Sequence, residues 1–137
     1  MLLTFGYTHC PDICPATLAV LGAAQRALGE ERDAVRTVFV TLDPVRDTSG
    51  HLAAYLANFD ANIVGLTGTE EEIRAVARQY HVKYAFRDGG PNLGVSIDHT
   101  AFIYLVDRQG RLRYLFPHVT PPDQLAEAAR QLLNDAP

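Results

Sequence analysis

The chain has 137 residues, of which 47% are hydrophobic and 20% are charged. This length fits one domain with a hydrophobic core, and the composition excludes a disordered chain, a collagen and a coiled coil. The net charge is −4 and lysine and arginine do not cluster, which argues against a nucleic-acid partner. The longest strongly apolar run, Ala101 to Val106, is far shorter than the roughly twenty residues of a membrane-spanning helix. We expect no signal peptide, because no basic region precedes the apolar residues at the start of the chain.

The spacing of apolar residues predicts alternating strands and helices. In the first half we expect a strand over 2–7, a helix over 16–28 that ends at Gly29, a strand over 35–42, a helix over 49–59 and a short strand over 63–66. A capping box over Thr69 to Glu72 predicts a helix from Glu70 to Tyr80.

The second half begins with a further expected strand over 83–86, followed by a loop over 87–98 that is rich in glycine. Two strands, 100–106 and 112–116, form an expected hairpin, and a last helix follows Thr120 and runs to about Leu133. A β-α-β unit followed by β-β-α around one sheet predicts an α/β, thioredoxin-like fold: a central mixed β-sheet flanked by helices, with a β-α insertion over 63–80. We expect residues 1–137 to form this single domain.

The expected topology brings distant residues to one edge of the sheet. Strands 2–7 and 35–42 run parallel, so their carboxyl ends share an edge, where Cys10 and Cys14 follow the first strand and Asp43 follows the second. The strand 100–106 runs antiparallel to them, so His99, at its beginning, belongs to the same edge. We therefore expect Cys10, Cys14, Asp43 and His99 to converge.

Cys10 and Cys14 are the two cysteines of the chain, and this count points to a local site rather than to a disulfide framework. Pro15 is favoured at the start of a helix, which places Cys14 at a helix amino terminus, where the macrodipole favours a thiolate. Redox chemistry, metal binding and chance are the alternatives. The C-x-x-x-C spacing is wider than the C-x-x-C of thioredoxins and favours metal binding.

Two thiolates and one imidazole would make a three-ligand site from Cys10, Cys14 and His99. Iron–sulfur clusters and structural zinc usually require four protein ligands, whereas copper accepts three. Of the remaining histidines, His9 is expected to pack locally beside Cys10. We expect the others to be surface residues: His51, His81 and His118.

Three sequence blocks resemble the signatures of the SCO/SenC proteins. These are Gly6-Tyr7-Thr8-His9-Cys10-Pro11-Asp12-Ile13-Cys14-Pro15, then Thr41-Leu42-Asp43-Pro44-Val45-Arg46-Asp47-Thr48, and then Asp98-His99-Thr100 before an apolar strand. The resemblance implies a thioredoxin-like domain that binds Cu(I), Cu(II) or both through Cys10, Cys14 and His99.

The resemblance also implies a function, a location and partners. The family helps to assemble the binuclear copper centre of cytochrome c oxidase, so the expected partners are the copper-bearing oxidase subunit or another copper chaperone. The expected location is the periplasmic side of the bacterial inner membrane. Members carry an amino-terminal anchor and extra strands before the cysteine strand, whereas Met1 opens that strand here.

Some assignments stay open at the level of sequence. Asp12, Asp43 and Asp98 are candidates to support the ligands from outside the coordination sphere. The segment from Asp43 to Asp47 is otherwise a turn held by Asx hydrogen bonds and an Arg–Asp pair. A metallochaperone without enzymatic turnover is our first functional hypothesis. A thiol–disulfide oxidoreductase with Cys10 and Cys14 as its redox pair is the second, and a thiol peroxidase is a weaker third.

Overall fold

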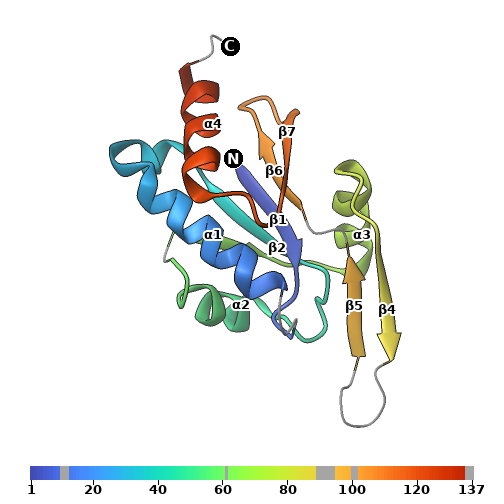
Figure 1. Ribbon diagram of the computed structural model, residues 1–137. Coiled ribbons are helices and arrows are strands. Elements are labelled where there is room, and N and C mark those ends of the chain that lie inside the picture. The colour runs from blue at the N-terminus through green and yellow to red at the C-terminus, as the bar shows by residue number, and fades with distance from the viewer. Residues whose placement is uncertain (10–12, 61, 89–94, 100–101, 135–137) are drawn as a thin grey trace.

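The computed structural model describes residues 1–9, 13–60, 62–88, 95–99 and 102–134, and it describes Ile13, 87–88 and 95–99 by their backbone (Figure 1). The first part of the chain forms β1 (Leu2–Gly6), α1 (Ile13–Ala27), a short 3-10 helix η1 (Gly29–Ala34), β2 (Thr37–Thr41), α2 (Ser49–Leu56) and β3 (Ile63–Leu66). The second part forms α3 (Glu70–Gln79), β4 (Tyr84–Asp88), β5 (Val95–His99), β6 (Phe102–Val106), β7 (Leu112–Pro117) and α4 (Pro122–Asn134).

The central sheet has five strands in the order β3-β2-β1-β6-β7. Strand β1 runs parallel to β2, and β2 runs parallel to β3, while β6 pairs antiparallel with both β1 and β7. This is the predicted thioredoxin-like arrangement, with β3 and α3 as the inserted pair. All residues of β1 and β2 are buried, as expected for strands that are covered on both faces.

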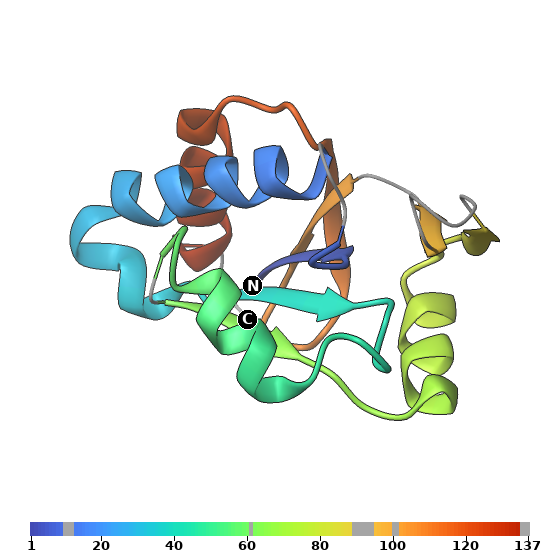
Figure 2. The ribbon, with the colours of Figure 1, turned by 90° about the horizontal axis from the view of Figure 1, so that it is seen from below.

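The two faces of the sheet have separate cores. Helices α1, α2 and α4 cover one face, where Leu21, Leu52 and Leu125 belong to one buried cluster with Phe39 of β2. Helix α3 covers the other face through Ile73, among others. Figures 1 and 2 show α1 and α4 side by side, with α3 apart from them. None of the described helices is long and apolar enough to cross a membrane.

Local sequence signals explain where several elements begin and end. Gly29 has φ of 59°, the left-handed conformation that commonly follows the last turn of a helix. Thr69 and Glu72 form the predicted capping box at the start of α3. Helix α1 begins at Ile13, three residues before the predicted start. Pro15 fits in its first turn because the backbone N–H groups there have no acceptor within the helix, so the N–H that proline lacks is not missed.

The prediction of a loop over 87–98 is wrong in part. Residues 84–88 and 95–99 form β4 and β5, which pair antiparallel as a separate two-stranded sheet with Tyr84 opposite His99. His99 therefore ends β5 instead of opening the next strand, and β6 begins at Phe102. The segment 89–94 and residues 100–101 lie outside the described residues.

Candidate metal centre

The candidate site lies at the edge of the central sheet where β1 and β2 end. Both views place the start of α1 and the two-stranded β4–β5 sheet at this edge, beyond the carboxyl ends of the parallel strands (Figures 1 and 2). The segment after β2, which contains Asp43, lies there too, because Leu42 donates its N–H to the carbonyl of Gly6, 2.7 Å away. The described elements that carry Cys14 and His99, α1 and β5, therefore lie toward one edge.

Cys14 lies in the first turn of α1 and is 3% exposed. Its sulfur packs against the last residue of β1, since a Cβ atom built on Gly6 would lie only 2.7 Å from Sγ. The place of Cys14 in the first helical turn exposes the sulfur to the positive end of the helix macrodipole, which favours the thiolate, the form that binds metals.

The other predicted ligands are described less fully. Cys10 and Asp12 lie outside the described residues. His99 and Asp98 are the last two residues of β5, where their backbones pair with Tyr84 and Ala85 of β4. The structure thus places the His99 backbone at the end of a strand, and the Cys10–Cys14–His99 ligand set remains a prediction.

Asp43 belongs to a hydrogen-bonded turn after β2. Its carboxylate pairs with the guanidinium of Arg46, and its backbone N–H donates to the hydroxyl of Thr41, 3.0 Å away. Asp47 donates its N–H to the carbonyl of Asp43, at 2.9 Å. The Arg–Asp pair that the sequence predicts in this turn is therefore present, between Arg46 and Asp43.

Asp47 connects the segment after β1 with the end of β2. Its carboxylate is fully buried and accepts three hydrogen bonds: from the N–H of Thr8 at 2.9 Å, the hydroxyl of Thr8 at 2.5 Å and the hydroxyl of Thr41 at 2.7 Å. These bonds fix Thr8, which stands two residues before Cys10. Asp47 therefore braces the segment that leads into the cysteine motif.

Two residues beside the Asp47 carboxylate, Thr8 and His51, were not predicted from the sequence. The Thr8 hydroxyl lies 2.9 Å from Nε2 of His51, which was expected to be a solvated surface residue. Nε2 of His51 is 3.9 Å from Oδ1 of Asp47, four residues earlier in the chain. The spacing of four residues between Asp47 and His51 was the sequence signal that could have indicated their contact, although Asp47 precedes the helix start at Ser49.

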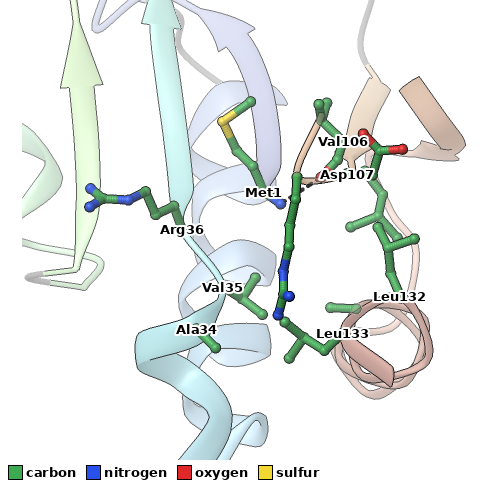
Figure 3. Close-up of a pocket in the computed structure, with 11 residues that line it drawn as sticks. Met1, Ala34, Val35, Arg36, Val106, Asp107, Leu132 and Leu133 are labelled. Carbon is green, nitrogen blue, oxygen red and sulfur yellow. Dashed lines mark hydrogen bonds between the residues drawn. The ribbon is translucent and has the colours of Figure 1, made fainter. Parts of the chain in front are cut away.

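A cavity of about 340 Å³ lies at the opposite end of the sheet (Figure 3). Its lining includes Met1 at the start of β1, Val35 before β2, Val106 at the end of β6, and Leu133 of α4. The carboxyl ends of β1 and β2 point away from it. This cavity is therefore separate from the edge that carries Cys14.

Comparison with known proteins gives the same identification along almost the whole chain. Residues 1–134 match the SCO1/SenC family model. The chain is 35% identical over 133 residues to the mitochondrial SCO2 homologue of Bos taurus, covering 96% of this chain and 50% of the relative. It is 36% identical over 129 residues to the SCO2-like protein of Rickettsia felis, covering 92% of this chain and 62% of the relative. The chain thus spans about half to three fifths of the length of these relatives.

Solved structures of relatives share the fold. ScoI of Bradyrhizobium japonicum with copper bound matches with a TM-score of 0.88 and 37% identity, covering 96% of this chain and 83% of that one. Yeast Sco1 with copper bound matches with a TM-score of 0.85 and 28% identity, covering 99% of this chain and 76% of that one. The family model, the relatives and the shared fold agree with the three sequence blocks, and the chain belongs to the SCO1/SenC family.

Proposed function

We propose that this domain binds copper through Cys10, Cys14 and His99 and carries it to a partner during assembly of the copper centre of cytochrome c oxidase. The observation that carries the proposal is the position of Cys14: the second cysteine of the family motif lies in the first turn of α1, at the edge where β1 and β2 end. Copper-bound structures of relatives support it, because two of them share this fold over at least 96% of the chain.

The donor set fits copper by its chemistry. Thiolates are soft ligands that select Cu(I), and an added imidazole suits both Cu(I) and Cu(II). The dipole of α1 lowers the free energy of the thiolate at Cys14. Three protein ligands leave the coordination sphere open, and an open site allows copper, as the cargo, to pass to another protein.

The surrounding residues would hold the donors in place. Asp47 binds Thr8 and so fixes the chain just before Cys10. Gly6 leaves the space in which the sulfur of Cys14 packs. The pairing of β5 with β4 fixes the backbone of His99. In this proposal, the copper-bearing oxidase subunit or another copper chaperone receives the metal, in the bacterial cell envelope.

A thiol–disulfide oxidoreductase is the second candidate, because a cysteine in the first turn of a helix is also suited to thiol exchange. The two functions differ in their need for His99. Copper binding uses its imidazole, whereas two cysteines can form a disulfide without it.

Copper binding by cysteine variants tests the proposal. The reduced protein should bind one copper per chain in competition with a chelator, and Cys10→Ala or Cys14→Ala should lower the Cu(I) affinity by more than a hundredfold, since each removes one of two thiolates. Val82→Ala is the matched control, because it removes buried methyl groups from the core cluster that contains Cys14 and keeps both thiols. Near-normal Cu(I) affinity in either cysteine variant would refute the two-thiolate site.

A further inference from the structure

Two imidazoles flank the buried carboxylate of Asp47. Nδ1 of His9 lies 4.0 Å from Oδ1 of Asp47, and Nε2 of His51 lies 3.9 Å from the same oxygen. The centroids of the two rings are 6.2 Å apart. His9 follows β1 and His51 is in the first turn of α2, so the fold brings together nitrogen donors that are 42 positions apart in the sequence.

The surroundings of Asp47 favour a cation. Its side chain has no exposed surface, while each imidazole is 48% exposed. Among the described residues, these two histidines are the basic groups within 4.0 Å of the carboxylate, and its hydrogen-bond donors are the neutral groups of Thr8 and Thr41. Buried carboxylates are ordinarily paired with a positive group, and a bound cation would supply one here.

A second carboxylate lies close to this group. One ligand atom each of His9, Asp43 and Asp47 lies within 4.8 Å of the others. Asp43 is paired with Arg46, which already neutralises its charge. We therefore place Asp43 beside the site and assign the ligand positions to His9, His51 and Asp47.

The ligand atoms would have to move together to hold a metal ion, since His51 adjoins Asp47 but lies outside the group of His9, Asp43 and Asp47 whose ligand atoms are within 4.8 Å of one another. Metal–nitrogen and metal–oxygen bonds of about 2.0 to 2.2 Å in a tetrahedral site place ligand atoms roughly 3.3 Å apart. The observed N···O separations of 4.0 and 3.9 Å exceed this by roughly 0.6 to 0.7 Å. Both imidazoles are half exposed and can rotate toward Asp47. The hydroxyl of Thr8, which lies 2.5 Å from Oδ1 of Asp47 and 2.9 Å from Nε2 of His51, would turn aside about its Cα–Cβ bond.

We propose that His9, His51 and Asp47 form a second metal site, which takes a divalent ion of intermediate softness such as Cu²⁺ or Zn²⁺. Two imidazoles and one carboxylate suit these ions, whereas Mg²⁺ prefers oxygen ligands throughout. The site uses no sulfur and none of the three ligands of the proposed copper carrier. Its ligands can therefore be replaced without removing any of those three.

The test uses a variant without the thiolate site: Cys10→Ala, Cys14→Ala and His99→Gln combined. Calorimetry with Cu²⁺ should show one ion per chain, and its electron paramagnetic resonance spectrum should show coupling to two nitrogens. Adding His51→Gln should lower the Cu²⁺ affinity at least tenfold, while adding His118→Gln, at a loop position between β7 and α4, should not change it. The proposal would be overturned if the triple variant bound no Cu²⁺, or if His51→Gln and His118→Gln left it with equal Cu²⁺ affinities.

A second measurement avoids the triple variant if it fails to fold. In the unaltered chain, Zn²⁺ beyond the first equivalent should shift the imidazole nitrogen resonances of His9 and His51 and leave those of His118 in place. The same amount of Mg²⁺ should shift none of them. Unchanged His51 resonances in excess Zn²⁺ would overturn the site.

Discussion

The sulfur of Cys14 packs against the bare Cα of Gly6: a Cβ atom there would lie 2.7 Å from Sγ. The same Cβ would lie 3.0 Å from a ring carbon of Phe39, which is buried in the core. The last residue of β1 therefore has to be small for the first turn of α1 to approach the sheet. This contact couples the stability of the fold to the position of a predicted metal ligand.

Gly6→Ala should therefore lower both stability and copper affinity. Crowding of this kind in a packed core costs roughly 1 to 3 kcal/mol in the free energy of unfolding, and urea denaturation measures it. The same variant should bind Cu(I) at least tenfold more weakly, because the Cys14 sulfur is displaced. Gly50→Ala is the control, since a Cβ at Gly50 in α2 meets nothing within 4 Å. Equal stability of the two alanine variants would contradict the packing argument.

Asp47→Asn should destabilise the protein through the hydrogen bonds that its carboxylate accepts. An amide NH₂ group in place of one oxygen faces the donors of Thr8 or Thr41 and cannot accept from them. The expected loss is about 2 kcal/mol in the free energy of unfolding, typical of hydrogen bonds to a buried charged group. Urea denaturation is the measurement, and Asp33→Asn, at an exposed position of η1, is the control. A loss no larger than that of the control would show that the three bonds contribute little.

The apolar pattern of the sequence predicted the main sheet but not the small second sheet. The alternation of strands and helices predicted the central mixed sheet, because buried central strands and amphipathic helices leave strong apolar patterns. The pairing of β4 with β5 was missed. Val95 and Ile97 alternate with polar residues as in a strand, but a two-stranded ribbon outside the main sheet leaves a weak pattern, and the neighbouring Gly89 and Gly90 favoured a loop.

The candidate site was predicted from local motifs and from the order of the strands. Cys14 lies in the first turn of its helix, as Pro15 indicated, because that signal is local. The group around Asp47 could not be predicted in this way. Thr8 meets Asp47 only because β1 and β2 are neighbours in the sheet, and no local pattern marks such a contact. His51 lies four residues after Asp47, and that spacing was the one local signal of this group.

Glu72 makes the start of α3 sensitive to pH. Hydrogen bonds from the backbone and side chain of Thr69 hold the pKa of the Glu72 carboxyl below its ordinary value of 4.5. Because the folded-state pKa is lowered, this contribution to stability is present above the ordinary value and is lost as the pH falls through the folded-state pKa. Thr69→Ala removes the side-chain bond and keeps the backbone bond, so it should raise the pKa of Glu72 part of the way toward its ordinary value in an NMR titration of the carboxyl carbons. Thr67→Ala, in the preceding segment, should not change it, and a Glu72 pKa that Thr69→Ala leaves unchanged would contradict the capping explanation.

His99→Ala separates a copper carrier from a thiol–disulfide reductase. The imidazole is a metal donor, but two sulfurs can join without it, so the variant should bind copper more weakly and still form a disulfide between Cys10 and Cys14. Cu(I) accepts two-coordinate dithiolate ligation, whereas Cu(II) does not do so readily. We therefore expect a loss of at least a hundredfold in Cu(II) affinity and a smaller loss, about tenfold, for Cu(I).

The measurement is paired: copper affinity in both oxidation states and the dithiol–disulfide potential, for the unaltered chain and for His99→Ala. His118→Ala is the matched control, because it removes an imidazole from the segment between β7 and α4 and leaves Cys10, Cys14 and His99 unchanged. If His99→Ala keeps both copper affinities and loses disulfide exchange, His99 serves thiol chemistry, and the reductase replaces the copper carrier as the function of this domain. If copper affinity falls while the potential stays within roughly 30 mV, which is about a tenfold change in the equilibrium constant for two electrons, the imidazole acts as a metal ligand and the copper carrier stands.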